Sequence, residues 1–247
     1  MIEVSENQNI RFTRASLMIP SDVKAILDVG CGQGNFLMDF VKTPIRKFAV
    51  DKDYSSLLHI HNPKSLASIN ALPFVEKAVD IVVCMEVIEH LPHGLYELAL
   101  RELSRVANKY ILITVPYNQK LQEMLVQCPL CYSRFNPYLH VRSFDDAKIS
   151  QLFSIFGWVC KEIKLIRKKN VYIYPLKNIY KSITFKDMPA NMKCPICDYF
   201  RPTERTTHNI YSVDNVSMIN KMKNIFLKIV PKKVGYSWIA GLYERKM

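Results

Sequence analysis

The segment AILDVGCGQG, residues 25–34, decides the fold, because an apolar run leads directly into three alternating glycines. Its first five residues are mostly apolar and partly β-branched, which is typical of a short buried strand. Gly30, Gly32 and Gly34 then form a turn in which backbone N–H groups can approach a ligand closely. Only seven of the 247 residues are glycine, so the chain concentrates its glycine at this turn.

The spacing of these glycines excludes two common phosphate-binding turns. The dinucleotide pattern G-x-G-x-x-G would need a glycine at position 35, which is Asn35. The pattern G-x-x-x-x-G-K-[ST] of nucleoside triphosphatases does not occur anywhere in the chain. What remains is the pattern D-x-G-x-G-x-G, which begins at Asp28.

Strand-like and helix-like segments alternate around this turn. Besides 25–29, we expect strands at residues 47–51, 66–69, 79–85, 110–115, 159–166 and 236–243. We expect helices at residues 10–19, 35–41, 55–61, 95–106 and 145–156. This alternation predicts a mostly parallel sheet with helices on both faces. Residues 169–233 break the rhythm and are rich in lysine.

These residues together resemble the class I S-adenosylmethionine-dependent methyltransferases. The resemblance runs in register from the glycine turn to Asp51, LPF (72–74), VDIVVCMEVIEHLP (79–92) and YILITVP (110–116). It implies a Rossmann-like α/β fold, with seven mostly parallel strands of which the seventh is antiparallel. It also implies a methyltransferase domain formed by residues 1–168 and 234–247, with residues 169–233 as a basic insertion.

The resemblance implies a role for each cofactor-side residue. Asp28 and the glycine turn would cradle the methionine part of S-adenosylmethionine, and Asp51 would accept hydrogen bonds from the ribose hydroxyls. Ser68 stands where the family usually carries an acid, and the N–H of Ile69 would meet the adenine. The complete predicted cofactor set is Asp28, Gly30, Cys31, Gly32, Gly34, Asp51, Ser68, Ile69 and Met85.

Acidic and histidine side chains follow the strand at 79–85. Glu86, Glu89 and His90 are spaced i, i+3 and i+4, so on a helical turn they would share one face. Glu86, His90 and His140 are the candidate catalytic residues, because a hydroxyl acceptor needs a base. The resemblance to two family branches, the ubiquinone-pathway O-methyltransferases and the small-RNA 2′-O-methyltransferases, implies an alternative. In this alternative, Glu86, Glu89, His90 and His140 form a Mg²⁺ or Mn²⁺ site. In a second alternative, Glu89 caps a helix and His90 packs under the cofactor.

Four of the seven cysteines form two knuckles, Cys128-Pro-Leu-Cys131 and Cys194-Pro-Ile-Cys197, with 62 residues between them. Two such C-x-x-C pairs predict one tetrahedral Zn²⁺ site. Four thiolates leave the metal no open position, so its role would be structural. The alternative is two redox or disulfide pairs. The segment from residue 128 to 144 resembles a knuckle-bearing branch of the methyltransferases, which implies small-molecule or glycan acceptors.

Charge divides the chain. Residues 1–125 hold 13 Lys/Arg and 14 Asp/Glu, whereas residues 126–247 hold 21 and 8. Basic residues at 167–205 alternate with aromatic ones, and residues 217–233 have the pattern of a basic amphipathic helix. This composition is compatible with nucleic acid, a phosphorylated substrate, peripheral contact with an anionic membrane, or a simple solvated surface.

Composition and the chain start narrow the class further. With 49% hydrophobic and 23% charged residues, a disordered or collagen-like chain is excluded. The first residues show no secretory signal and no run of 18 apolar residues occurs, so we expect a cytoplasmic protein. We expect O-methylation of a small sugar, lipid or quinol-like acceptor. The alternatives are an RNA 2′-O-methyltransferase and a non-catalytic cofactor-binding scaffold that binds nucleic acid or membrane.

Overall fold

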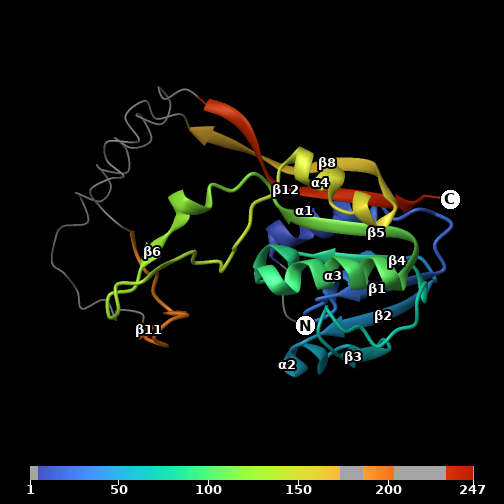
Figure 1. Cartoon of the computed structure of the whole chain (residues 1–247), viewed down its shortest axis with the longest axis horizontal. Helices are drawn as coiled ribbons and strands as arrows, with labels where there is room; N and C mark the ends of the chain where they lie inside the picture. Colours follow the sequence, from blue (N-terminus) through green and yellow to red (C-terminus); the bar gives the residue numbers. More distant parts are fainter. Residues whose placement is uncertain (1–4, 173–185, 203–231, 247) are drawn as a thin grey trace. The chain divides into compact units, whose positions relative to one another are not determined.

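The computed structural model describes residues 5–172, 186–202 and 232–246. The chain divides into two compact units (Figure 1). The first unit contains Met1–Gln119, Val141–Lys168 and Tyr236–Met247, and the second contains Lys120–His140 and Lys169–Gly235. Among the described residues, no helix is long and apolar enough to span a membrane.

The first unit is built on a seven-stranded sheet with the order β3-β2-β1-β4-β5-β12-β8. Its strands are β1 (Ala25–Val29), β2 (Arg46–Asp51), β3 (Lys64–Leu66), β4 (Val79–Met85), β5 (Ala107–Pro116), β8 (Trp158–Tyr172) and β12 (Lys232–Arg245). Strands β1 to β5 pair in parallel, and β12 pairs antiparallel with β5. The predicted seven-stranded, mostly parallel sheet with an antiparallel last strand is therefore confirmed.

The helices of the first unit are α1 (Glu6–Ser16), α2 (Tyr54–Leu57), α3 (His93–Val106) and α4 (Asp146–Gln151), and its short turns are η1 (Phe36–Phe40), η2 (Ile88–His90) and η4 (Ser154–Phe156). Helix α1 starts four residues before its predicted start, because Ser5 and Gln8 form a capping box ahead of the apolar pattern. The helix predicted at 145–156 is split, and its last turn ends at Gly157 with φ +81°.

Apolar side chains fill both faces of this sheet. Leu27 and Val29 of β1 belong to the cluster that contains Leu103 of α3. Ile26, the residue before Leu27, belongs to the opposite cluster with Phe12 of α1. All five residues of β1 are buried, as expected for a central parallel strand covered on both sides. Figure 1 shows α3 lying across the strands on one face.

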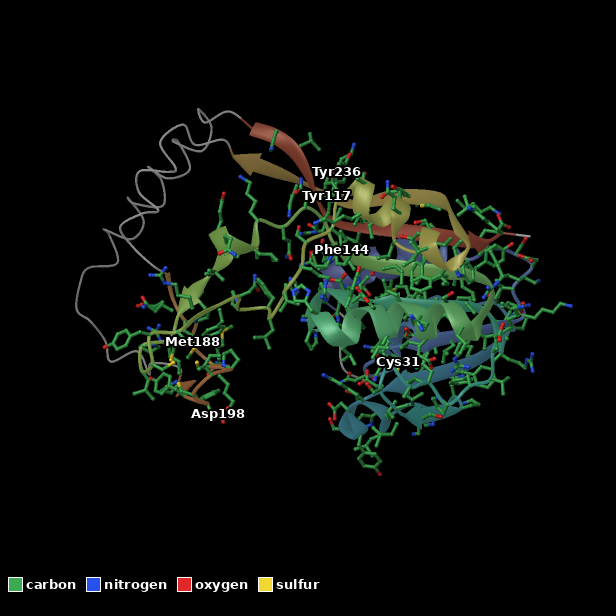
Figure 2. All side chains as sticks on the ribbon, in the orientation of Figure 1. Cys31, Tyr117, Phe144, Met188, Asp198 and Tyr236 are labelled. Atoms are coloured by element: carbon green, nitrogen blue, oxygen red, sulfur yellow. The ribbon has the colours of Figure 1, made fainter. Side chains whose placement is uncertain are left out.

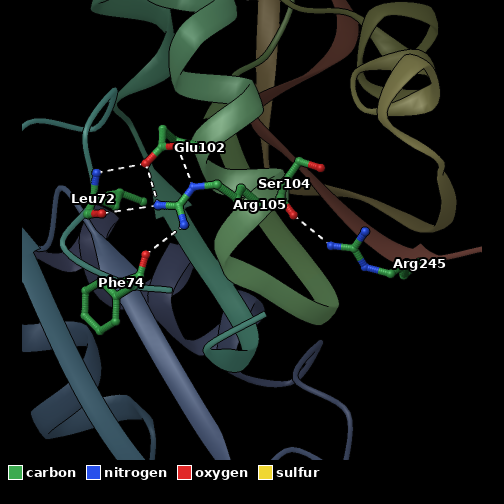
Figure 3. Close-up of polar contacts among 6 residues, drawn as sticks. All are labelled: Leu72, Phe74, Glu102, Ser104, Arg105 and Arg245. Atoms are coloured by element: carbon green, nitrogen blue, oxygen red, sulfur yellow. Dashed lines mark hydrogen bonds and ion pairs between the residues drawn. The ribbon is translucent and has the colours of Figure 1, made fainter. Parts of the chain in front are cut away.

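A polar network fastens the segment after β3 to helix α3 (Figure 3). Arg105 donates to the carbonyl oxygens of Phe74 at 2.7 Å and Leu72 at 3.2 Å. Glu102 pairs with Arg105 at 2.7 Å and also accepts the Leu72 N–H at 2.9 Å. Arg245 of β12 donates to the carbonyl oxygen of Ser104 at 2.8 Å, so α3 is tied on two sides.

The chain leaves and re-enters the first unit where aromatic residues meet (Figure 2). The ring centroid of Tyr117, just after β5, lies 6.4 Å from that of Tyr236. Tyr117 also forms a parallel backbone bridge with Phe144. These contacts bring together the residues that flank the first excursion into the second unit and the residue that follows the second excursion.

The second unit is described in part. Its elements are η3 (Leu121–Met124), β6 (Val126–Gln127), β7 (Arg134–Phe135), β9 (Lys186–Asp187), β10 (Met192–Lys193) and β11 (Phe200–Arg201). Strands β7, β6 and β9 form one sheet, and β10 pairs with β11. Met188 is buried beside Val126 and Phe135. The expected amphipathic helix at 217–233 falls almost entirely outside the described residues, as do Lys177, Lys181 and Arg205.

Candidate functional site

The glycine turn follows β1 and has the backbone conformation that its composition predicts. Gly30, Gly32 and Gly34 have φ values of +74°, +51° and +77°, which L-residues with a side chain rarely adopt. The N–H groups of Gly30 and Cys31 donate to the carbonyl oxygen of Val50, at 2.8 and 3.1 Å. The turn is therefore fixed to the end of β2.

Asp51 closes the other side of this turn. Its Oδ2 accepts the N–H of Gly32 at 2.8 Å, and its Oδ1 accepts the N–H of Asp53 at 2.9 Å. These two bonds fix the carboxylate at the carboxyl end of β2, where α/β sheets bind ligands. Each oxygen keeps a second lone pair for a hydroxyl donor.

Two cavities meet at Gly30 and Gly32. The first has a volume of about 320 Å³, and its lining includes Asp51, Ser68, Ile69, Glu86 and His90. The second has a volume of about 360 Å³, and its lining includes Gln8, Arg11, Asp28, Cys31 and Met85. Cys31 is labelled in Figure 2. Gly34 lines neither cavity and instead packs against Ile60.

Asp28 is a buried carboxyl group at the end of β1. Only 1% of the residue is exposed, and its Oδ1 has no hydrogen-bond partner. Burial and the nearby charge of Asp51 raise its pKa to about 7, against the opposing effect of Arg11. An ammonium group in the second cavity would supply the missing donor.

Glu86 directly follows β4 and has a left-handed backbone, with φ +58°. Its Oε2 accepts the indole N–H of Trp238 at 2.8 Å and lies 3.1 Å from Nη1 of Arg11. Its Oε1 is buried and has no partner. Burial raises the pKa of Glu86 to about 7, although Arg11 and Trp238 act in the opposite direction.

Glu89 and His90 lie on η2, one turn further along the chain. Glu89 is fully buried, and neither of its carboxylate oxygens has a hydrogen-bond partner. Burial and the charge of Glu86 raise the pKa of Glu89 to about 8. Nε2 of His90 lies 3.8 Å from Oε1 of Glu89. Because η2 starts at Ile88, Glu86 does not share a helical turn with them, contrary to the prediction from spacing.

The turn at η2 is anchored by the residues that follow the first excursion. Val141 donates its N–H to the carbonyl oxygen of Glu89 at 2.9 Å. Arg142 donates to the carbonyl oxygens of Ile88 and Leu91, and its guanidinium lies 3.9 Å from the ring centroid of Tyr96. His140 belongs to the second unit, where its ring centroid lies 5.6 Å from that of Tyr138. Its catalytic or ligand role stays a prediction.

Sequence reasoning missed Arg11 and Trp238. Arg11 lies on α1 and Trp238 on β12, and both contact Glu86. Neither belongs to a motif, and the only available signal was a charged residue on the apolar side of α1, next to Phe12.

The four knuckle cysteines converge within the second unit, and their sulfur atoms all lie within 4.8 Å of one another. The sulfurs of Cys128 and Cys197 are 3.7 Å apart, and those of Cys131 and Cys194 are 3.8 Å apart. All seven cysteines of the chain are free. The hydroxyl of Ser133 lies 2.9 Å from Cys131 and 3.5 Å from Cys194.

The two knuckles have the same backbone form. Tyr132 and Asp198, each one residue after a knuckle, have φ values of +58° and +60°. Their N–H groups donate to the carbonyl oxygens of Cys128 and Cys194, at 3.0 and 3.1 Å. Both tight turns therefore have a residue other than glycine at the position with positive φ. They place both pairs of thiols toward one point.

The sheet order, the D-x-G-x-G-x-G turn and the fixed acid at the end of β2 define a class I S-adenosylmethionine-dependent methyltransferase. Residues 27–110 match the family described as a methyltransferase domain. The chain is therefore an S-adenosylmethionine-dependent methyltransferase, and the predicted enzyme class and cofactor are confirmed.

Known proteins similar to this chain include one sequence relative and several solved structures. An uncharacterized protein of Methanocaldococcus jannaschii is 25% identical over 210 residues, which cover 80% of this chain and 77% of that protein. A methyltransferase of Archaeoglobus fulgidus matches at TM-score 0.55 and 16% identity, covering 98% of this chain and 95% of its own.

A third similar structure contains bound ligands. The 1,6-didemethyltoxoflavin-N1-methyltransferase of Burkholderia thailandensis, solved with 1,6-didemethyltoxoflavin and S-adenosylhomocysteine, has a TM-score of 0.54 and 11% identity. The match covers 96% of this chain and 78% of that one. At these identities, the solved structures show a shared fold.

Proposed function

We propose that the protein transfers the methyl group of S-adenosylmethionine to an oxygen atom of a small molecule, such as a sugar, lipid or quinol-like acceptor. The position of Glu86 carries this proposal. Glu86 lines the first cavity, and its Oε1 is buried without a hydrogen-bond partner. A hydroxyl acceptor must lose a proton as the methyl group arrives, and a carboxylate beside the cofactor provides the base.

The residues present fit the cofactor. Gly30 leaves no room for a side chain, since a Cβ there would lie 2.3 Å from Cγ2 of Val87. In the proposed arrangement, the Asp51 carboxylate accepts hydrogen bonds from the ribose hydroxyls, and Ser68 and Ile69 border the adenine in the first cavity. Asp28 accepts the ammonium group of the methionine part in the second cavity. When bound, the cofactor supplies an electrophilic methyl group on a positively charged sulfur.

Glu86 then performs the proton chemistry. The Glu86 carboxylate would accept the proton that the acceptor hydroxyl loses when its oxygen takes the methyl group. A pKa of about 7 suits a base that works near neutral pH. His90 also lines the first cavity and is the alternative base.

A second candidate is metal-assisted methylation of an RNA 2′-hydroxyl. Two unpartnered carboxylate oxygens on Glu89, with Nε2 of His90 at 3.8 Å, favour it. In this candidate Glu86, Glu89, His90 and His140 hold Mg²⁺ or Mn²⁺, and the ion orients the hydroxyl.

An acceptor screen tests the proposal. The protein is incubated with S-adenosylmethionine and panels of sugars, quinols, lipid headgroups and short RNAs, with and without Mn²⁺, and S-adenosylhomocysteine formation is measured. We expect a small hydroxyl compound to be methylated without added metal. Glu86→Gln should lower kcat about 10²- to 10⁴-fold and flatten its pH profile, without changing cofactor affinity as strongly. Turnover of RNA alone, and only with metal, would contradict the proposal.

For the second unit, we propose a structural Zn²⁺ held by Cys128, Cys131, Cys194 and Cys197. Tetrahedral zinc with Zn–S bonds of about 2.3 Å places its sulfur ligands about 3.8 Å apart. The two distances between the knuckles, 3.7 and 3.8 Å, fit this value. The nearby Ser133 hydroxyl and backbone N–H lower the pKa of Cys131, which favours the thiolate that binds metal.

A further inference from the structure

The two cysteine knuckles of the second unit carry exposed aliphatic side chains at the same position. Leu130 and Ile196 each directly precede the second cysteine of a C-P-x-C sequence. They are 61% and 71% exposed. A single exposed apolar side chain needs no explanation, but a matched pair beside one cluster indicates a surface that contacts something apolar.

The cysteine cluster has a buried side and an outer side. Cys128 and Cys194 are fully buried in the small core that contains Met188, which is labelled in Figure 2. Cys131 and Cys197, the second cysteines of the two knuckles, are more accessible. Because all four sulfur atoms lie within 4.8 Å of one another, both aliphatic side chains adjoin the outer side of a single cluster.

Aromatic side chains extend this apolar surface. Tyr132 directly follows the first knuckle and is exposed. Phe200 pairs in β11 with Lys193, the residue before the second knuckle, and is also exposed. The tight turns that end both knuckles fix the backbone here, so the apolar side chains stand on a preorganised support. We call Leu130, Tyr132, Ile196 and Phe200 the knuckle-tip surface.

The unit that carries this surface is strongly basic. Its segments, Lys120–His140 and Lys169–Gly235, contain 14 Lys/Arg and five Asp/Glu, a net charge of +9 in a chain whose total is +12. The exposed Arg134 and Lys193 lie within three residues of the knuckles. A charged surface of this sign is complementary to an anionic partner.

We propose that the knuckle-tip surface inserts into the interface of an anionic lipid bilayer, and that the positive charge of the second unit attracts it there. Apolar side chains enter the boundary between headgroups and acyl chains, and Lys and Arg side chains are drawn to negatively charged lipids. Single-stranded nucleic acid would attract the same charge, but it binds by stacking on aromatic rings, which Leu130 and Ile196 lack. This surface is separate from the methyl-transfer chemistry proposed above.

Vesicle sedimentation with the full chain tests the proposal. The protein is mixed with vesicles of phosphatidylcholine alone, or of phosphatidylcholine and phosphatidylglycerol in equal parts, and its partition coefficient is measured. We expect at least about tenfold stronger binding to the anionic vesicles. Raising the salt from about 0.1 M to about 1 M should weaken this binding, because the screening length falls from about 10 Å to about 3 Å.

Two double variants test insertion of the aliphatic tips. Leu130→Ser with Ile196→Ser removes apolar surface without changing charge, and we expect it to lower the partition coefficient about tenfold or more. Leu130→Trp with Ile196→Trp should raise it, because tryptophan favours the membrane interface. A folding defect would lower both. Ile155→Ser, at an 84% exposed position of the first unit, is the matched control and should change nothing.

Three results would overturn the proposal. The first is equal binding of the wild type to neutral and anionic vesicles, or no binding to either. The second is an unchanged partition coefficient for the serine double variant. The third is tight binding of a short single-stranded RNA that the serine double variant loses while vesicle binding stays the same, which would assign the knuckle-tip surface to nucleic acid.

Discussion

At the scale of single residues, two backbone positions shape the cavities. Gly30 and Glu86 both have positive φ, at +74° and +58°, and they directly follow the neighbouring strands β1 and β4. Gly30 tolerates this conformation at no steric cost, whereas Glu86 is held in it. Trp238 and Arg11 contact the Glu86 side chain, so tertiary contacts offset the strain at this position.

Replacing Gly30 by alanine should impair both stability and cofactor binding. The new Cβ would lie 2.3 Å from Cγ2 of Val87, at a φ that disfavours alanine. We expect the free energy of unfolding to fall by about 1–3 kcal/mol, and S-adenosylhomocysteine binding to weaken at least tenfold. Denaturant unfolding and calorimetry measure the two effects. Gly94→Ala, which has open space on α3, should change neither by a comparable amount.

The buried carboxyl of Asp28 should make stability depend on pH. Its pKa is raised from 3.8 to about 7, so the folded state favours the protonated form. Its stabilising contribution is complete below about pH 4 and is lost as pH rises through 7, with an upper limit of about 4 kcal/mol. Urea unfolding between pH 5 and 8, without cofactor, should show a shallower decline for Asp28→Asn. Identical pH slopes would contradict this assignment.

At the scale of elements, helix α3 supports one wall of the first cavity. Arg105 and Glu102 bind the backbone of Leu72 and Phe74, which follow the cavity residues Ser68 and Ile69 in the chain. This wall of the cavity therefore depends on the side chains of Glu102 and Arg105, which lie about thirty residues further along the chain.

Removing this fastening should loosen the wall. Arg105→Met would leave two backbone carbonyls and Glu102 without their donor, and we expect a loss of about 1–3 kcal/mol in unfolding free energy. Binding of 5′-methylthioadenosine should weaken as well, because the first cavity is proposed to hold adenosine. Arg101→Met, exposed on the same helix, should remain within about 0.5 kcal/mol of the wild type.

At the scale of the whole molecule, two compact units carry separate chemistry. The first unit contains the sheet and the two cavities, and the second contains the four knuckle cysteines and a small apolar core around Met188. A small core is a weak source of stability, so a metal would contribute much of the folding energy of the second unit.

Purified protein should contain about one zinc per chain, which Cys194→Ser should remove. The second unit should then become sensitive to limited proteolysis, while the first unit still binds S-adenosylhomocysteine. Cys160→Ser, at a half-buried cysteine outside the cluster, should keep its zinc. Metal analysis and mass spectrometry check the outcome, and two intact disulfides without metal would contradict it.

Much of the fold followed from local pattern. The glycine turn, the strand β1 and the acid at the end of β2 depend on residue type over short distances, and such signals can be read directly. The residues at which helices begin and end were less predictable. Helix α1 begins at a polar cap, and the predicted helix at 55–61 ends at Leu57.

In the candidate site too, local sequence pattern predicts some residues and misses others. Sequence pattern identified Asp28, Asp51 and Glu86, because each follows or ends a recognisable strand. It could not identify Arg11, whose importance comes from contacts with residues far along the chain.

The sequence by itself therefore determined the enzyme class, the cofactor turn and the convergence of four cysteines, since spacing and residue type encode them. Only the tertiary structure decided that Arg11, Glu86 and Trp238 meet. Glu86 and Trp238 are 152 residues apart, and their contact exists because β12 inserts antiparallel beside β5. Burial there also left Asp28, Glu86 and Glu89 with raised pKa values, because desolvation depends on the assembled fold.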